Sequence, residues 1–248
     1  MDNWQRLSDE INQSQITIGF WWRDDDAVAD TPALQKMLNI ARDNDLPVHL
    51  AVIPMALEHS LSIIKAPHNS PISYVLQHGV EHKSYALSGQ RKIELGGSQA
   101  VLPLVTKLST GHQLLSQRFA GQYLSILVPP WNRISSQVAE KLPQVGYKKL
   151  SVLHSQKRVE SNFELNVHID IINWQQRAFA GEEVILDKII RLLANRRLSV
   201  DVSTKPIGLM THHLDHDKQC WDFICKFFKF CREHPKIQWV SGETLYQH

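Results

Sequence analysis

The sequence predicts an α/β protein built on a parallel sheet, either open or closed into a barrel. Short apolar runs alternate with segments of helical period along the 248-residue chain, as repeated strand–helix units require. Roughly seven or eight of these runs have the length of a buried strand. Polar side chains that can bind a metal ion or transfer a proton gather where the runs end. In parallel α/β folds, this edge of the sheet carries the active site.

Strands are expected where apolar runs of strand length lie between turn residues. These runs lie at residues 16–22, 47–54, 71–79, 123–130, 148–153, 163–172, 207–213 and 237–241. The first is ITIGFWW. The fourth, YLSILVPP, ends in two prolines, which cannot donate to a sheet ladder and so mark its end.

Helices are expected at residues 31–45, 56–66, 98–119, 135–146, 182–196 and 218–234. Thr31 is a preferred N-cap residue, and Pro32 suits the first helical position. Gly146 suits the left-handed residue that follows a helix end. No internal repeat, low-complexity tract or long linker interrupts this pattern, so we expect one domain over residues 1–248.

Composition and charge exclude several classes of protein. Apolar residues make up 43% and charged residues 21%, which is ordinary for a globular chain and not for a disordered one. A net charge of +2 does not indicate a nucleic-acid partner. No run of about 18 apolar residues predicts a membrane span. The N-terminal MDNWQRLSDEINQSQ lacks the features of a secretory signal, and no pattern indicates an oligomeric state.

Cys220, Cys225 and Cys231 lie together in one apolar segment of helical period. An odd number of clustered cysteines argues against a disulfide framework and favours a cytoplasmic protein. We expect buried thiols rather than metal ligands. His49 lies in a strand of buried type and is expected to be structural.

The polar residues of interest follow strands that are far apart in the sequence. They are Asp24, Asp25 and Asp26 after the first strand, His78 and His82 after the third, the PPWNR segment at 129–133, Asp170 and Trp174, and the THHLDHD segment at 211–217. Because all carboxyl ends of a parallel sheet open onto one face, these segments are expected to meet.

Each of these features has an ordinary structural explanation when taken alone. Aspartates at strand ends commonly cap the next helix, and an HxxxH pair arises often by chance. Asp170 can pair with a basic residue, and Trp131 and Trp174 can be core side chains. His212 and His213, if they lie in a strand, point to opposite faces, so at most one faces a shared site.

Together, these residues indicate a catalytic metal site. If His78 and His82 share a helical turn, both imidazoles lie on one face and can bind one metal ion. Two histidines and one carboxylate leave coordination positions open for water and substrate. A second carboxylate beside the first can then act as a base on the attacking water.

In these segments the chain resembles the polysaccharide deacetylase family, the NodB-type carbohydrate esterases. The family motifs appear as RDDDA, HGVEH, LVPPWN, DIINW and LMTHH, in the family order, over residues 20–213. The segment WVSGETL at 239–245 resembles the final strand and turn of the family. The wording of the motifs is most similar to the WalW-like branch. The resemblance implies a distorted (β/α)7 barrel and metal-dependent removal of an acetyl group from a sugar.

The resemblance also implies roles for individual residues. The metal ligands are expected to be Asp26, His78 and His82. The catalytic residues are expected to be Asp25 as base and His212 as general acid, with His213 as the alternative acid. The substrate-binding residues are expected to be Pro130, Trp131, Asn132, Asp170 and Trp174.

One departure from the family pattern affects the base. The loop arginine that pairs with the base in the family is Val128 here, and Arg23 or Arg133 is a candidate replacement. Asp24 has no counterpart among the paired acids of the family. Asp170 also lies farther from its tryptophan than in the usual pattern. The ligand set is therefore better preserved than its supporting residues.

The predicted cofactor is one divalent metal ion, with zinc as first choice and cobalt, nickel or manganese as alternatives. The predicted partner is a carbohydrate with an acetylated amino sugar. Two other functions stay open. One is a catalytically silent barrel that binds metal and glycan, and the other is a metal-dependent hydrolase of another C–N or ester bond.

Overall fold

A computed structural model describes residues 2–65, 72–154, 162–198 and 205–248. In this part of the chain, eight strands form one sheet in which every paired neighbour is parallel. The strands are β1 (Ile18–Ala27), β2 (Val48–Val52), β3 (Ser73–His78), β4 (Tyr123–Val128), β5 (Lys149–Leu150), β6 (Val167–Asp170), β9 (Ile207–Thr211) and β10 (Ile237–Trp239). The predicted fold class is confirmed.

The sheet order β5-β4-β3-β2-β1-β9-β6 places β1 at the centre, and β10 pairs with the first part of β1. The two end strands approach each other through isolated parallel bridges, Leu150–Glu164 and Leu153–Val167. The sheet is therefore curled and joined only irregularly at its ends, as in a distorted (β/α)7 barrel. A short antiparallel pair, β7 (Ile172–Asn173) and β8 (Ala178–Phe179), stands apart from this sheet.

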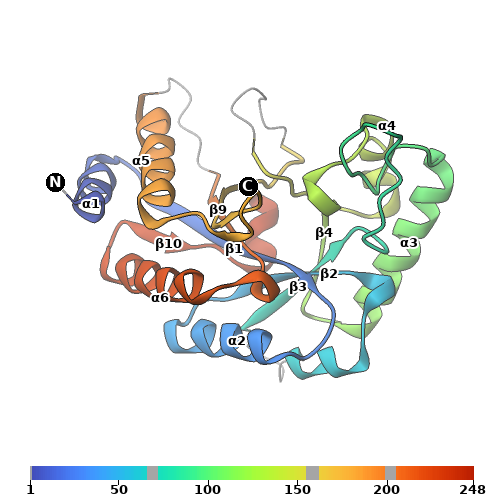
Figure 1. Cartoon of the computed structure of the whole chain (residues 1–248), viewed down its shortest axis with the longest axis horizontal. Coiled ribbons are helices and arrows are strands. Elements are labelled where there is room, and N and C mark those ends of the chain that lie inside the picture. The colour runs from blue at the N-terminus through green and yellow to red at the C-terminus, as the bar shows by residue number, and fades with distance from the viewer. Residues whose placement is uncertain (1, 66–71, 155–161, 199–204) are drawn as a thin grey trace.

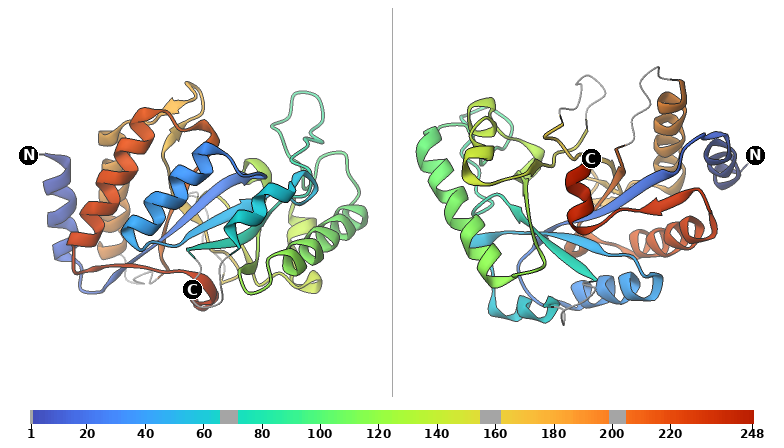
Figure 2. Two further views of the ribbon diagram at one scale, coloured as in Figure 1. Left: turned by 90° about the horizontal axis from the view of Figure 1, so that it is seen from below. Right: turned by 180° about the vertical axis from the view of Figure 1, so that it is seen from behind.

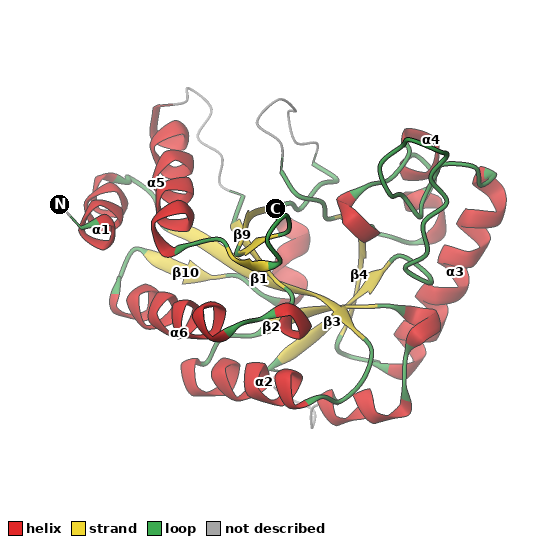
Figure 3. Ribbon diagram, in the orientation of Figure 1, coloured by secondary structure: helices red, strands yellow, loops and turns green. Residues whose placement is uncertain are grey.

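Helices surround the sheet on its outer side (Figures 1 and 3). They are α1 (Asn3–Gln13), α2 (Pro32–Asn44), α3 (Val101–Arg118), α4 (Ser136–Ala139), α5 (Glu182–Leu198) and α6 (Lys218–Glu233). Figure 2 shows α2 and α6 next to each other on one face, and α1 lies against α5. The caps follow the sequence, because Thr31 accepts from the N–H of Leu34 and Gly146 takes a left-handed conformation.

Alternation along β1 divides its side chains between two compartments. Phe20 and Trp22 point outward and pack on the phenylalanines of α6, with ring centroids 5.8 Å and 4.7 Å from Phe227 and Phe228. Trp21 points inward, into a cluster with side chains of β2, β3, β4, β6 and β9. Because successive strand residues face opposite sides, this alternation also decides where the following acidic residues can point.

Several predicted elements differ from the structure in length or type. The helix predicted at 56–66 is a pair of 3-10 segments, Pro54–Ala56 and His59–Ile64. The strand predicted at 148–153 has only two residues in regular pairing. Helix α1 was not predicted, because its stripe of buried residues is reduced to Leu7 and Ile11. Residues 66 and 71, at the ends of two predicted elements, lie outside the described ranges.

The three cysteines are unpaired, as expected. Cys220 and Cys231 are buried, but Cys225 is exposed, so the expectation of three buried thiols is wrong at that position. Its place on α6 faces solvent because the helix has one apolar stripe and Cys225 falls outside it. Among the described helices, none combines the length and hydropathy that crossing a membrane demands.

Candidate active site

The predicted site residues lie at the carboxyl edge of the central strands. Asp25 and Asp26 lie near the end of β1, His78 ends β3, and Trp131 follows β4. Asp170 ends β6, and His212 follows β9. The expectation that the acids follow the first strand needs correction, since β1 continues through them to Ala27.

Asp26, His78 and His82 form a cluster with metal-ligand geometry. Their ligand atoms lie within 4.8 Å of one another. Oδ1 of Asp26 lies 3.1 Å from Nε2 of His78 and 3.4 Å from Nε2 of His82. This carboxylate oxygen is buried and has no well-oriented hydrogen-bond donor among the described residues. An orphaned carboxylate oxygen facing two imidazole nitrogens fits a divalent cation.

The tautomer of His78 supports the same conclusion. Its Nδ1 lies 3.0 Å from the carbonyl oxygen of Val128, which can only accept, so Nδ1 carries the proton. Nε2 is then free to act as a ligand, an arrangement that metal-binding histidines commonly use. Burial opposes ionisation of both groups, yet their contact lowers the pKa of Asp26 and raises the pKa of His78.

The backbone at Asp26 explains how one strand separates three consecutive acids. Asp26 has φ 71°, in the left-handed region, and the pairing of β1 with β2 shifts register between Asp24 and Ala27. This irregularity breaks the alternation and redirects one side chain, as β-bulges do. Asp25 shares the inward face with Trp21, whereas Asp24 shares the outward face with Trp22.

His78 and His82 do not share a helical turn, so helical spacing is not what brings their imidazoles together. Gly79 and His82 have positive φ angles of 51° and 56°, so the segment between them is an irregular loop. The buried carboxylate of Glu94 holds this loop. Its oxygens accept from the N–H groups of Val80 at 3.1 Å and Glu81 at 2.7 Å. A Cβ at Gly79 would lie 2.0 Å from Glu94 Oε2, so only glycine fits there.

Arg23 is the partner of Asp25. Its Nε lies 2.8 Å from Oδ1 of Asp25, and its terminal nitrogen lies 2.9 Å from Oδ2. Both side chains are buried, at 0% and 2% exposure. The guanidinium also donates to the hydroxyl of Ser151 at 2.8 Å and to the side-chain oxygen of Asn132 at 2.9 Å. An arginine two residues earlier on the same strand thus provides the contact that Val128 cannot make.

Asp24 belongs to a separate pair. Nδ1 of His213 lies 2.5 Å from Oδ1 of Asp24, and Oδ2 accepts from the hydroxyl of Thr211 at 2.6 Å. Both members of the pair are buried. Burial disfavours their charged forms, but the contact lowers the pKa of Asp24 and raises that of His213. His213 therefore faces away from the cluster of Asp25 and Asp26.

His212 is the histidine that faces Asp25, with Nε2 3.9 Å from Oδ2. Its ring lies edge-on to Trp174, with centroids 4.6 Å apart. Trp174 donates to Asp170 at 2.8 Å, and burial raises the pKa of Asp170. Nδ1 of His212 is buried without a partner among the described residues. Trp174 itself is 45% exposed and so is available to a ligand.

The PPW loop presents an aromatic surface to the cluster. Trp131 and Asn132 both have φ 55°, an uncommon conformation that often marks a functional segment. The Trp131 ring lies 4.6 Å from the ring of His82. Pro130 is buried. The side-chain oxygen of Asn132 accepts from Arg23, so Asn132 contacts the Asp25–Arg23 pair.

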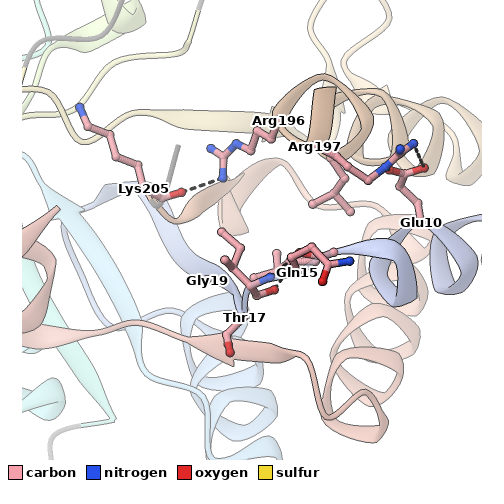
Figure 4. A pocket seen from close by; sticks show the side chains of 11 residues that line it. Glu10, Gln15, Thr17, Gly19, Arg196, Arg197 and Lys205 are labelled. Carbon is pink, nitrogen blue, oxygen red and sulfur yellow. Dashed lines mark hydrogen bonds and ion pairs between the residues drawn. The ribbon is translucent and has the colours of Figure 1, made fainter. Parts of the chain in front are cut away.

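A separate pocket lies at the opposite edge of the sheet, beside the first residues of β1 (Figure 4). Thr17 and Gly19 line it together with Arg196, Lys205 and the ion pair between Arg197 and Glu10. None of the predicted site residues lines this pocket. From Gly19 to Asp26 an extended strand covers roughly 23 Å, so the pocket is remote from the metal-ligand cluster.

The sequence matches no protein-family model and no curated protein. Solved structures are similar in fold. A family 4 carbohydrate esterase from Streptomyces lividans, in complex with acetate, gives a TM-score of 0.57 at 15% identity, covering 94% of this chain and 95% of that chain. A Mycobacterium smegmatis protein described as a polysaccharide deacetylase gives a TM-score of 0.65 at 13% identity, covering 95% and 91%.

A third similar structure is a pseudoenzyme of the same esterase family from Bacillus anthracis. It gives a TM-score of 0.54 at 10% identity, covering 91% of this chain and 64% of that chain. At such identities the likeness establishes the fold alone. What the site does has to be argued from its own residues.

Proposed function

We propose, on the premise that this chain has the fold of the family 4 carbohydrate esterases and polysaccharide deacetylases, that it is a metal-dependent hydrolase. The proposed reaction removes an acetyl group, first of all an N-acetyl group, from a sugar. The observation that carries the proposal is the cluster of Asp26, His78 and His82, which lies beside an acid paired with arginine and a histidine facing that acid.

Asp26, His78 and His82 would hold one divalent ion, with zinc as first choice and cobalt, nickel or manganese as alternatives. When bound, such an ion supplies Lewis-acid chemistry: it polarises the acetyl carbonyl and makes water a stronger acid. The bonding of His78 to the Val128 carbonyl and of Glu94 to the intervening loop fixes the ligand positions before binding. Such preorganised support raises metal affinity.

Asp25 acts as the base. It accepts a proton from the attacking water while the water oxygen bonds to the acetyl carbonyl carbon. A terminal nitrogen of Arg23 donates to Oδ2 of Asp25, and its Nε lies 2.8 Å from Oδ1, so this ion pair would hold Asp25 in one orientation. The backbone N–H of Trp131, in the loop that follows β4, would stabilise the oxyanion that forms.

His212 acts as the acid. In its protonated form it donates to the leaving nitrogen as the C–N bond breaks, giving acetate and a free amine. Its position against Trp174, which is itself hydrogen-bonded to Asp170, restricts the ring to the edge of the site. Trp131 and Trp174 form the walls for the sugar, because aromatic faces suit the apolar face of a sugar ring.

The test is acetate release from N-acetylated chito-oligosaccharides after loading with zinc, cobalt, nickel or manganese. Asp26→Asn should weaken metal binding about 10-fold or more. Asp25→Asn should retain metal and lower turnover by roughly 100- to 10,000-fold. Equal metal loss in both variants, or near-normal turnover in Asp25→Asn, would contradict the assignment of roles.

A catalytically silent barrel that binds metal and glycan is the second candidate. Val128 in place of the loop arginine favours it, and one similar structure is a pseudoenzyme. The pairing of Asp25 with Arg23 argues for the enzyme instead, since the base keeps a guanidinium partner. Metal and glycan binding without acetate release, over all four metals, would establish the silent barrel.

A further inference from the structure

Basic side chains gather on the two loops that flank Trp131. The loop at residues 79–99 and the segment at 129–136 together hold Lys83, Arg91, Lys92 and Arg133, against only two acids, Glu81 and Glu94. The whole chain carries a net charge of only +2. With four cations and two acids, these two segments have a formal charge of +2 beside the candidate active site.

Lys92 lies next to the aromatic wall of the site. Its ammonium is 5.7 Å from the centroid of the Trp131 ring, and that ring is 4.6 Å from the ring of His82. The Lys92 ammonium thus lies within about 10 Å of a proposed metal ligand. This separation is comparable to one or two sugar rings measured from the reacting acetyl group.

Arg133 adds a second cation at the same place. Its guanidinium donates to the carbonyl oxygen of Lys92 at 2.8 Å. Partial burial and the neighbouring charge of Arg91 lower the pKa of Arg133. Like charges held close together repel each other unless an anion lies between them. Within the described ranges, Arg91, Lys92 and Arg133 form no ion pair with an acid.

The two acids nearby do not neutralise these cations. Glu94 is buried and accepts from backbone N–H groups. Glu81 accepts from the Tyr85 hydroxyl at 2.9 Å and pairs with Lys107 at 3.5 Å. Both carboxylates are thus committed to other partners, which leaves the three cations available to a ligand.

The backbone holds the two loops together. Leu95 and Ile134 form a parallel bridge, and the N–H of Ser135 donates to the carbonyl oxygen of Leu95 at 2.9 Å. The cations are therefore attached to loops fixed relative to Trp131. Because the loops are already fixed, less conformational entropy is lost when an anion binds.

We propose that Arg91, Lys92 and Arg133, the basic rim, bind an anionic substituent of the substrate. The substrate class is then an acetylated saccharide that carries a phosphate or carboxylate group on or next to the acetylated sugar. This inference rests on the proposed function and narrows it. Guanidinium and ammonium groups are suited to both anions.

Calorimetric titration tests the basic rim without turnover. The probes are N-acetylglucosamine, N-acetylglucosamine-1-phosphate, N-acetylmuramic acid and inorganic phosphate. Exposed ion pairs each contribute up to a few-fold in affinity, so one anionic sugar should bind about tenfold more tightly than the neutral sugar. The preference should disappear at about 1 M salt, where the Debye length is about 3 Å.

The variant Lys92→Gln/Arg133→Gln should lose most of this preference while binding the neutral sugar unchanged. Lys92→Glu should lower affinity for the anionic sugar further. This variant keeps Arg133 and its hydrogen bond to the carbonyl oxygen of residue 92, so it tests the charge at position 92 by itself. The matched control is Lys229→Gln/Arg232→Gln, which removes two exposed cations from α6 and should retain the preference. Melting temperatures check that each variant is folded.

The two anionic sugars identify the source of the anion. Preference for the phosphate sugar or for the carboxylate sugar supports the basic rim and names its ligand. Equal affinity for the neutral and both anionic sugars, or tight binding of inorganic phosphate in both the parent and the double variant, overturns it. Acetate release from neutral chito-oligosaccharides tests the proposed function separately, so either idea can fail alone.

Discussion

Three consecutive aspartates in β1 have three different surroundings. Asp24 faces outward to His213 and Thr211, Asp25 faces inward to Arg23, and the left-handed backbone at Asp26 turns it to His78 and His82. Adjacent carboxylates would repel each other in a shared environment. The strand avoids this by giving each acid its own cationic or metal-binding partner.

Replacing Arg23 should separate orientation of the base from metal binding. Arg23→Lys keeps the charge but cannot place two nitrogens against the two carboxylate oxygens of Asp25. We therefore expect kcat for acetate release to fall about tenfold with metal content unchanged. Arg23→Met leaves Asp25 buried and unpaired, which should lower the free energy of unfolding by about 3–5 kcal/mol. Steady-state kinetics, metal analysis and denaturant unfolding measure these effects.

The control places an arginine at position 128, at the end of β4, in a chain that lacks Arg23. Val128 belongs to the inward cluster that also contains Met210, and the Met210 sulfur lies 2.9 Å from the Arg23 guanidinium. Arg23→Met/Val128→Arg should therefore recover part of the turnover that Arg23→Met loses. A double variant no better than the single one would show that position 128 cannot serve as the partner.

Substitutions of the two adjacent histidines should have different effects, one on stability and the other on turnover. His213→Ala leaves Asp24 buried without its imidazole, so the free energy of unfolding should fall by about 3–5 kcal/mol. His213→Asn retains a donor and should lose less. His212→Ala should keep the stability of the parent and lose turnover. Urea unfolding with acetate assays decides, and a stable His213→Ala variant would disprove the structural role.

At the scale of an element, the loop between β3 and α3 positions His82, one of the three proposed metal ligands. It is neither helix nor strand, and Glu94 accepts from the N–H groups of Val80 and Glu81, which lie 14 and 13 residues before it in the sequence. Loops that carry function commonly depend on such a fixed support. We therefore expect the loop to depend on Glu94 to keep His82 close to His78.

Glu94→Gln should weaken metal binding. The amide replaces one acceptor with a donor that faces a backbone N–H, so the loop loses a hydrogen bond and its preferred shape. Supporting residues of this kind are typically worth about 10- to 100-fold in metal affinity. Competition titration with a chromophoric chelator measures the affinity, and melting without metal checks the fold.

The exposed Glu140, at the end of α4, provides a charge-matched control. Glu140→Gln should bind metal like the parent protein. If Glu94→Gln also did so, the loop would hold its shape without the buried carboxylate, and the role of Glu94 would be limited to filling space.

For the whole molecule, His49 links stability to pH. Burial lowers its pKa to about 4, although its hydrogen bond to the Trp22 carbonyl raises it. Nδ1 donates to that oxygen at 2.8 Å, and Nε2 accepts from the N–H of Gly242 at 3.3 Å. The neutral ring therefore joins β2 to β1 and to the C-terminal segment, as expected for a structural histidine.

The sign of the pH effect follows from this pKa. Between pH 6.5 and about 4 the unfolded chain takes up a proton on His49 and the folded protein does not. His49 should thus reduce the free energy of unfolding by roughly 3 kcal/mol as pH falls through this window. Denaturant unfolding at several pH values gives the free energy of unfolding as a function of pH. This free energy should fall less steeply with decreasing pH in His49→Gln than in the parent, and the exposed His59→Gln variant is the control. Identical slopes would contradict the prediction.

Periodicity predicted much of the molecule. The parallel sheet, the caps at Thr31 and Gly146, and the meeting of distant strand ends all follow from local patterns that the fold obeys. The meeting of the β1 acids with the end of β3 was predictable for the same reason, whereas the choice of Asp26, His78 and His82 as a set came from the resemblance to the polysaccharide deacetylase family. These features depend on side-chain type and spacing, which the sequence displays directly.

The remaining features depend on backbone angles and partners that local patterns do not encode. Asp26 and His82 both adopt left-handed backbone angles although neither is a glycine, so the residue type at these positions does not signal them. The choice between His212 and His213 depends on where β9 ends. Glu94 stood in a loop without a motif, and its only signal was an acid placed after the glycine-containing HGVEH segment.

Because Arg23 and Asp25 lie on one strand, their pairing is independent of the other strands that contribute to the site. A single backbone sets the distance between base and cation, so their pairing does not require a second strand to arrive in register. From the PPW loop, the side chain of Asn132 contacts this pair through its hydrogen bond with Arg23. Within the proposed function, exchanging the Trp131 side chain should then alter sugar preference while the Arg23–Asp25 pair on β1 stays assembled, which gives engineers a way to change the substrate without disturbing the proposed base.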